Sequence, residues 1–483
     1  MARSFIKDFL TLSLGTITNI IISVITTPII TRIVNPDQYG QYSLMLTYGS
    51  ICSAIVVLGL NQALIRFFYI SEDLPYRKAL IRFCFAVPLA LTIIACLASV
   101  AFFVGTNNDD VRRGVLFGSV FSVYLISLTL NTFSSIVTRL QFKIKLLSFM
   151  TVVNKIVFVA FALFLILATS LEDSLSLILA TAVAGVIVSV VQIVNDKNLW
   201  DPRNASASHV VDISALLRYA LPVWLSSGIA ILLQGIDKMG LGFFSTDYEL
   251  GIYASAFSIV NIFSIIQSSF NTIWQPTSIE RYEKNRNDTA FFIRGNDLIT
   301  LAMFGLGIII IIFKDIFILL LGAEYRSASS LVPYLIFVPI FYTISETTVS
   351  GINFTNKTKY HLLISVGALG VAFVSMVLTV PSLGSIGAAL SMSLAYATFF
   401  ALRSHYGQKC FFVRFHFKKI ALTSIVVFAY ATFCTFATCQ VVESLVGLPI
   451  LAFVLLIYRK TTAEMLLLAK GKFKGLLSKR REK

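Results

Sequence analysis

The chain has 483 residues, of which 57% are hydrophobic and 13% are charged, and its formal net charge is +15. A soluble domain usually carries about 25% charged residues, so this composition excludes an ordinary soluble protein and indicates a polytopic membrane protein. The positive charge does not indicate nucleic-acid binding, because no soluble segment is long enough to supply a basic binding face.

Fourteen apolar runs follow one another along the chain, and most approach the ~20 residues that a helix needs to cross the hydrocarbon core. In the ninth run Lys314 and Asp315 interrupt the apolar sequence, so we expect that helix to end near Phe313. The sequence predicts an all-α integral membrane protein with about 14 transmembrane helices. The runs lie at 9–33, 40–64, 80–104, 115–138, 146–168, 174–194, 215–243, 252–275, 296–313, 331–353, 360–380, 385–404, 418–440 and 445–458.

The basic residues are distributed unevenly between the two sides of the membrane. If the helices alternate in direction, 32 of the 39 Lys and Arg residues fall on one side and five on the other. The positive-inside rule therefore predicts that both termini are cytoplasmic. We expect the first run to remain as a membrane helix, because it is too long for a signal peptide and lacks a clear cleavage site.

The longest polar connection, at about 195–214, divides the helices into similar groups. We predict an N-lobe of helices 1–6 over residues 1–200 and a C-lobe of helices 7–12 over residues 210–407. Residues 415–483 are expected to form helices 13 and 14 and a basic cytoplasmic tail. The two six-helix lobes are expected to be pseudo-symmetric.

A short motif occurs once in each predicted lobe, between the first and second helices of that lobe. Residues 31–44 read TRIVNPDQYGQYSL and residues 242–255 read GFFSTDYELGIYAS. Alignment of Gly40 with Gly251 pairs helix 1 with helix 7, and the six intervening helices give both copies the same direction in the membrane. We expect Asp37 and Asp247 to cap or approach the following helices, where the dipole favours negative charge. Two parallel repeats of this kind are typical of transporters with a central cavity.

Four stretches of the sequence resemble a known transporter family. The segments RIVNPDQYGQYSL, GIDKMGLGFFSTDYELGIYASAFSI, FILLLGAEYRSASSLVPYL and VPSLGSIGAALSMSLAYA are similar to the helix 1–2, 7–8, 9–10 and 11–12 regions of polysaccharide-type flippases. This family is the Wzx-like polysaccharide transport branch of the multidrug/oligosaccharidyl-lipid/polysaccharide (MOP) exporter superfamily. The resemblance extends over both predicted lobes.

The resemblance implies two lobes in a V that alternate access across the bacterial inner membrane. It implies that the protein flips an undecaprenyl-pyrophosphate-linked oligosaccharide from the cytoplasmic to the periplasmic leaflet for O-antigen, capsule or exopolysaccharide synthesis. The expected partners are this lipid-linked substrate, membrane lipids, a coupling H⁺ or Na⁺ and a polysaccharide polymerase, with no cofactor.

Two other functions are compatible with many helices. A cation-coupled exporter of small amphiphiles, as in the MATE branch, usually has twelve helices. A polymerase or ligase would need a long extracytoplasmic loop with catalytic groups, and none of the loops outside is long enough. The protein is therefore not expected to be an enzyme.

Charged residues within spanning helices are candidates for function, because a buried charge costs several kcal/mol. Asp237 and Lys238 lie deep in the seventh apolar run. Lys238 is expected to bind the lipid pyrophosphate or an acidic sugar, and Asp237 to tune that site or to carry a coupling ion. Alternatively, each charge is matched by a neighbouring helix and the pair is structural.

Three polar residues near helix ends are further substrate-binding candidates. Arg66 lies near the inner end of the second run and Arg32 near the outer end of the first, and in the lipid II flippases related to this family arginines at similar places line the cavity. Alternatively, both arginines reach toward the membrane interface. Asn61 could bind sugar hydroxyls or support helix packing.

Two other ionisable residues lie within apolar runs. Glu346 is a lone carboxylate in its run, flanked by Ser and Thr, and it could bind a coupling H⁺ or Na⁺ or form a helix–helix hydrogen bond. Lys155 lies near the inner end of the fifth run, and we expect it to reach the interface.

Overall fold

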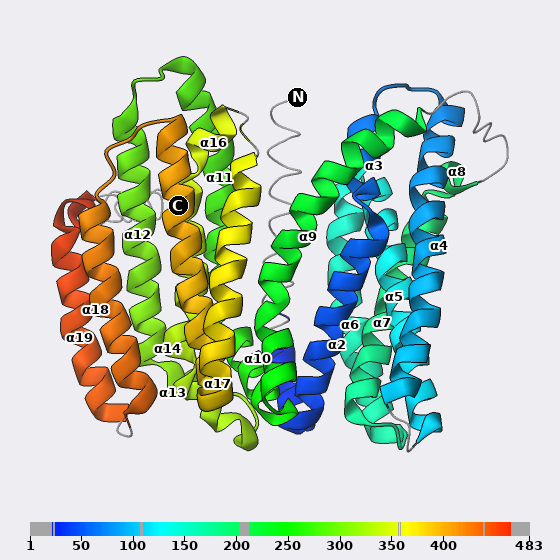
Figure 1. Cartoon of the computed structure of the whole chain (residues 1–483), viewed down its shortest axis with the longest axis horizontal. Helices are drawn as coiled ribbons and strands as arrows, with labels where there is room; N and C mark the ends of the chain where they lie inside the picture. The colour runs from blue at the N-terminus through cyan, green and yellow to red at the C-terminus, as the bar shows by residue number, and fades with distance from the viewer. Residues whose placement is uncertain are drawn as a thin grey trace, which may run out of the picture. The chain divides into compact units, whose positions relative to one another are not determined.

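The structure is a computed structural model that describes residues 22, 25–106, 110–201, 212–355, 357, 359–437 and 440–464. Every regular element among these residues is a helix, which confirms the all-α class (Figure 1). The first predicted helix lies mostly outside the described residues, as does the basic tail.

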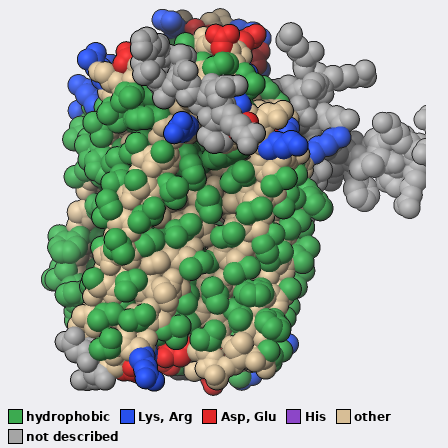
Figure 2. Space-filling view, turned by 90° about the vertical axis from the view of Figure 1, so that its right-hand side faces the viewer, with side chains coloured by type: hydrophobic (Ala, Val, Ile, Leu, Met, Phe, Trp, Pro, Cys, Tyr) green, Lys and Arg blue, Asp and Glu red, His purple; other side chains and the backbone are tan. Residues whose placement is uncertain are grey.

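The helices are long and apolar enough for a multi-pass membrane protein. Nine of the described helices could cross a membrane, or up to twelve if each of three bent pairs is one span. The expected total of fourteen stays a prediction. Figure 2 shows one face on which hydrophobic side chains cover the middle and charged side chains gather toward the two ends, as a bilayer requires.

The chain divides into two compact units, Met1–Ala254 and Ser255–Lys483. The boundary between these units differs from the boundary predicted between the lobes at about 200–210, so the lobes stay a prediction. In the first unit, α9 packs against α2 and α3, while α5 packs against α4 and α7. The helices of this unit are α2 Pro36–Val57, α3 Leu60–Phe67, α4 Leu74–Thr106, α5 Val111–Leu140, α6 Ile144–Ala168, α7 Asp173–Asn195, α8 Lys197–Trp200, α9 Ile213–Phe244 and the first part of α10 Asp247–Val260.

Four helices that start in the first unit begin at a side-chain cap. Asn35, Asp110, Asp212 and Thr246 each accept a hydrogen bond from the backbone N–H three residues later, at 2.9, 3.1, 3.0 and 3.3 Å. Such caps satisfy one of the free N–H groups at the helix start. The sequence therefore fixes where α2, α5, α9 and α10 begin.

The second apolar run is broken rather than continuous. Leu58 and Gly59 have positive φ angles of 50° and 71°, and α2 and α3 meet there at 53°. A side chain at Gly59 would lie 2.4 Å from the carbonyl oxygen of Ala220 in α9. The break therefore lets α9 approach the backbone closely. The run after α9 is also bent, since α10 and α11 meet at 47°, but Ile262 just before α11 keeps a helical φ of −56°.

The second unit holds the remaining helices. One of them, α17, contains a non-helical residue, Gly384, with φ 53° and ψ −130°, so two helices are joined there. This position separates the two runs expected at 360–380 and 385–404. The helices are α11 Phe263–Lys284, α12 Thr289–Ile312, α13 Lys314–Ile318, the 3₁₀ helix η1 Ala323–Ser330, α14 Val332–Leu335, α15 Phe337–Thr348, α16 Ser350–Phe354, α17 Lys359–Cys410, α18 Phe417–Phe436 and α19 Gln440–Ile457.

The last two helices are attached to α12 at both of its ends. The α12 helix ends at Ile312, close to the expected end at Phe313. Just beyond it, buried Lys314 lies 2.9 Å from Oε2 of Glu443 in α19. Near its start, Asp297 lies 2.9 Å from Nδ1 of His416, which precedes α18. Lys314, which interrupts the ninth apolar run of the sequence, therefore has a buried partner.

Candidate functional site

The repeated motif forms the start of α2 and the start of α10. Asn35 caps α2, so the expected capping role of Asp37 is not observed. Asp37 lies exposed in the first turn, and Asp247 lies in the first turn of α10. Both carboxylates approach a helix N-terminus, where the dipole favours negative charge.

The two copies of the motif contact each other within the first unit. A Cβ atom on Gly40 would lie 2.0 Å from the carbonyl oxygen of Asp247, and one on Gly251 would lie 1.9 Å from that of Pro36. Gln41 Nε2 also donates a hydrogen bond of 2.9 Å to Asp247 Oδ2. No side chain fits at either glycine, so the two backbones touch directly.

Asp237 is held by the second copy of the motif. Its side chain is 1% exposed, and its Oδ2 accepts a hydrogen bond of 2.7 Å from the hydroxyl of Tyr253 in α10. Its Oδ1 accepts one of 2.8 Å from the backbone N–H of Lys238. The tyrosine of the Gly-x-Tyr pattern therefore fixes the buried carboxylate.

Lys238 differs from its neighbour. Its side chain is half-buried, and among the described residues its ammonium has no ion-pair partner. Successive residues of a helix diverge by about 100°, which explains why Asp237 does not pair with it directly. Lys238 therefore places a positive charge in a spanning helix, where the nearby carboxylate of Asp237 attracts it without forming an ion pair.

The remaining candidates of the first unit do not form one site. Arg32 is exposed in the turn before α2, and Arg66 is exposed in the last turn of α3. Because α2 spans about 33 Å, the two arginines lie far apart. Arg32 lies toward the end that holds the glycine contact, which is also the end nearer to Lys238. Asn61 lies half-buried on α3 near Arg66, with its Oδ1 accepting a hydrogen bond from Gln62 N–H.

An apolar cavity lies between α2 and α9. Its volume is about 200 Å³, and its lining contains only aliphatic side chains, glycine and one tryptophan. Trp224 Nε1 donates a hydrogen bond of 2.9 Å to the carbonyl oxygen of Ala54, which fixes the indole ring at the cavity wall. The lining residues are Ile51, Ala54, Ile55, Trp224, Leu225, Gly228, Ile229, Ile231 and Leu232.

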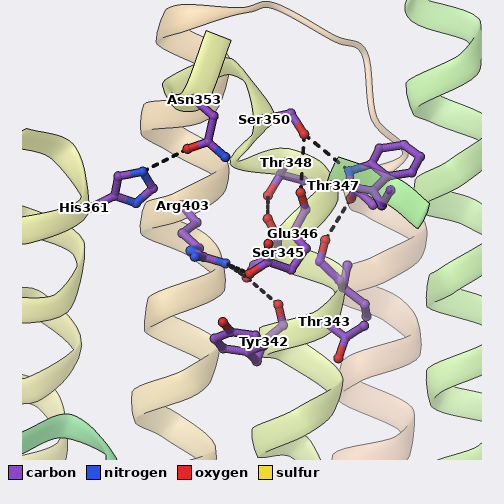
Figure 3. A network of polar contacts seen from close by, with 12 residues as sticks. Tyr342, Thr343, Ser345, Glu346, Thr347, Thr348, Ser350, Asn353, His361 and Arg403 are labelled. Atoms are coloured by element: carbon purple, nitrogen blue, oxygen red, sulfur yellow. Dashed lines mark hydrogen bonds and ion pairs between the residues drawn. The ribbon is translucent and has the colours of Figure 1, made fainter. Parts of the chain in front are cut away.

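Glu346 lies in the second unit and is not a lone carboxylate. Its Oε1 lies 2.6 Å from an Nη1 nitrogen of Arg403 on α17, and both side chains are nearly buried (Figure 3). The same nitrogen donates a hydrogen bond of 2.9 Å to Ser345. Arg403 lies at the end of the run expected at 385–404, and the structure makes it the partner of Glu346.

Aromatic rings enclose the guanidinium of Arg403. Its central carbon lies 5.3 Å from the ring centroid of Tyr342 and 4.6 Å from that of Phe399, within the range of cation–π attraction. Among the described residues, its buried Nε has no hydrogen-bond partner. The arginine is thus compensated by the carboxylate of Glu346, the hydroxyl of Ser345 and two rings, while its Nε is left unsatisfied. Within the described parts of the chain, no group of three or more His, Cys, Asp or Glu side chains is placed to hold a metal ion.

A family model described as a polysaccharide biosynthesis protein matches residues 5–281, which is more than half of the chain. The chain belongs to this polysaccharide biosynthesis family. No curated protein matches its sequence. The expected resemblance to polysaccharide-type flippases is therefore confirmed.

Solved structures of membrane transporters have a similar fold. The chain is similar to the lipid II flippase MurJ in an inward closed conformation, with a TM-score of 0.69 and 13% identity over 95% of this chain and 100% of that chain. It is also similar to a MATE family transporter of the MOP superfamily in an inward-facing conformation, with a TM-score of 0.59 and 12% identity over 80% and 93% of the two chains. A D35N mutant of the Vibrio cholerae MATE transporter VcmN gives a TM-score of 0.52 at 15% identity over 89% and 98%.

At 12 to 15% identity, these solved structures show the fold that the chain shares with those proteins. The sequence pointed to Asp237, Lys238 and Glu346. It did not point to Tyr253, which bonds to Asp237, or to Arg403, which pairs with Glu346. Tyr253 belonged to a recognised motif, so its hydroxyl could have been proposed as a partner for Asp237. Arg403 stands at the very end of a predicted helix, and that position was the only available signal.

Proposed function

We propose that this protein is a flippase for undecaprenyl-pyrophosphate-linked oligosaccharides in the bacterial inner membrane. It would move repeat units from the cytoplasmic to the periplasmic leaflet, with both of its termini in the cytoplasm, for the synthesis of O-antigen, capsule or exopolysaccharide. The family match and the transporter fold support a lipid-linked flippase or MOP transporter in general.

The observation that carries the proposal is the unpaired charge of Lys238. A cation in a spanning helix costs several kcal/mol, so its retention without an ion-pair partner among the described residues favours a role with an anionic ligand. The lipid pyrophosphate or an acidic sugar supplies that anion. Arg32 lies toward the same end of the first unit and is the second candidate, whereas Arg66 and Asn61 would act at the other end. The apolar cavity beside Trp224 is suited to part of an isoprenoid chain, because its lining is almost entirely hydrocarbon.

The glycine contact between α2 and α10 is the proposed closure of the periplasmic side. Two backbones in direct contact leave no passage for a sugar, so the contact must open when the substrate leaves. The hydrogen bond from Gln41 to Asp247 would break in the same step. A closure made from backbone packing and one polar bond can separate without the large cost of exposing an apolar core.

Glu346 is the proposed coupling residue, with Asp237 as the second candidate. Proton transfer to Glu346, or Na⁺ binding to it, would neutralise the carboxylate and release the guanidinium of Arg403. Asp237 already accepts hydrogen bonds from Tyr253 and from the backbone, so it is better suited to fix α9 against α10. A polysaccharide polymerase would then use the flipped product.

A MATE-like exporter of small amphiphiles is the second candidate function. The similarity of fold to MATE transporters favours it, since those structures cover up to 89% of this chain. Overexpression in a drug-sensitive strain separates the two functions. Raised tolerance to cationic drugs, with no effect on surface polysaccharide, would support the exporter.

The decisive experiment replaces Lys238 in a strain that lacks its own chromosomal copy. Lys238→Gln should abolish surface polysaccharide and leave lipid-linked repeat units on the cytoplasmic leaflet, because the anionic group loses its counter-charge. Immunoblotting and solvent extraction of lipid-linked sugars measure both quantities. Arg218→Gln is the matched control, since Arg218 is an exposed cation on the same helix and should leave transport unchanged. Full polysaccharide synthesis by Lys238→Gln at normal protein levels would contradict the proposed role.

A cross-linking experiment tests the proposed closure. Cysteines at positions 41 and 247 should be joined by a short bifunctional thiol reagent, because the native side chains lie 2.9 Å apart. The joined protein should lose transport at least tenfold, and a reducible reagent should allow recovery after reduction. Cysteines at the exposed positions 145 and 149 of α6 serve as the control pair. Transport at an undiminished rate with the link in place would reject the closure.

A further inference from the structure

A second cavity of about 200 Å³ lies within the first unit, among α5, α6 and α7. Its lining is mostly polar, in contrast to the apolar cavity beside Trp224. Six of the nine lining side chains carry hydrogen-bonding or charged groups, and Lys155 is the only charged one. The lining residues are Asn131, Ser135, Leu147, Met150, Thr151, Asn154, Lys155, Val188 and Gln192.

Lys155 does not lie at the end of its helix. Because α6 begins at Ile144, Lys155 is about 16 Å along the helix axis and close to its middle. The expectation that Lys155 reaches the interface from the inner end is therefore not supported by the helix bounds. Its half-buried ammonium instead faces a polar cavity.

No carboxylate among the described residues compensates Lys155. Its recorded contact is with the ring of Phe158, one helical turn along, at 5.9 Å from the centroid. The buried carboxylate of Asp196, at the end of α7, is already bound by Lys143 and by the hydroxyl of Thr138. The cavity thus contains a cation without a counter-ion.

Several amide groups in the cavity have N–H donors that lack an acceptor among the described residues. The hydroxyl groups of Ser134 and Ser135 donate to Oε1 of Gln192 at 2.8 and 3.3 Å, and Ser135 also donates to Oδ1 of Asn131 at 3.0 Å. These bonds hold the side-chain oxygens of Gln192 and Asn131 and leave their nitrogens without a part in them. The amide nitrogens of Asn131, Asn154 and Gln192 donate to no side chain or backbone group of the described residues. Polar groups in a spanning region are costly when they are unsatisfied, so a ligand with oxygen acceptors fits here.

We propose that this cavity binds a monosaccharide residue that carries one carboxylate, within the oligosaccharide of the proposed function on which this inference rests. The carboxylate lies against Lys155, and the ring hydroxyls bond to the amides and hydroxyls of the lining. A volume below the ~300–1,000 Å³ of common ligand sites suits one sugar residue rather than a whole lipid-linked unit. The flippase therefore selects acidic glycans at this position.

The test measures binding of small probes to the purified full-length protein in detergent by saturation-transfer NMR. Glucuronate should give a saturable signal with the wild type, and glucose should give a signal at least fivefold weaker. Lys155→Gln should reduce the glucuronate signal at least fivefold, and Lys155→Arg should restore most of it. Lys145→Gln, which removes an exposed lysine from the same helix, should leave the signal unchanged.

A second variant tests the same cavity without changing Lys155. Asn131→Asp has the shape of the native residue and places a negative charge in the cavity, so it should also abolish the glucuronate signal. An unchanged signal in both variants would overturn the proposal. A Lys155-dependent signal from inorganic pyrophosphate, or Lys155-dependent binding to phosphatidylglycerol vesicles, with none from glucuronate, would overturn it as well.

Transport separates this proposal from the flippase function. If lipid-linked oligosaccharides are flipped but glucuronate does not bind, the acidic-sugar site is rejected and the flippase function stands. If glucuronate binds through Lys155 but no lipid-linked sugar is flipped, the cavity is confirmed as an acidic-sugar site while the transport function fails.

Discussion

Two pairs of intramembrane charges follow opposite rules in this molecule. Asp237 and Lys238 are adjacent in sequence but do not pair, since Asp237 is bound by Tyr253 and by the backbone. Glu346 and Arg403 are 57 residues apart and form a direct ion pair between α15 and α17. The comparison teaches that sequence proximity does not identify charge partners on helices. The two cations also differ in what ligand binding would require. Lys238 has no ion pair to break among the described residues, whereas Arg403 would first have to leave Glu346.

Removal of Arg403 should produce the largest effect on stability. Arg403→Gln leaves Glu346 buried without its partner, which costs about 3–5 kcal/mol. Thermal unfolding of the purified protein, compared with the double variant Glu346→Gln/Arg403→Gln, measures the coupling. The double variant should recover a large part of the loss. A single variant as stable as the wild type would remove the distinction between the paired and the unpaired site.

Loss of the Tyr253 hydroxyl should have an intermediate effect. Tyr253→Phe removes a 2.7 Å hydrogen bond to a buried carboxylate and should destabilise the protein by about 1.5–3 kcal/mol. The same unfolding assay applies, with Tyr248→Phe as the control for an exposed tyrosine on α10. An equal response to both substitutions would show that Asp237 does not depend on Tyr253.

Substitution of Lys238 should affect stability least. Lys238→Gln removes a cation that has no ion-pair partner, so the free energy of unfolding should change by less than about 1 kcal/mol in either direction. The combination of unchanged stability with lost transport would sharpen the contrast with Arg403. A loss comparable to that of Arg403→Gln would place Lys238 among the structural charges.

The sequence allowed the helical class, the repeat and the intramembrane charges to be predicted, since each depends on local composition. The break at Leu58 and Gly59 could not be predicted, because it follows from the approach of Ala220, far away in the chain. The partner of Glu346 was missed for the same reason. Lys155 was assigned to an interface because the apolar run did not show how far α6 extends or which polar groups of α5 and α7 face it.

The contact between Gly40 and Gly251 has a consequence for how the two repeats can diverge. Each glycine lies against the backbone of the other segment. If either glycine were replaced by a larger residue, the clash would be with main-chain atoms, so no side-chain substitution in the other segment could relieve it. Only a shift of the main chain would make room. Both segments must therefore keep glycine at these positions. The charges near them are under no such constraint, and they differ in place, since Arg32 lies in the first turn whereas Lys238 lies deeper in the helix before the second.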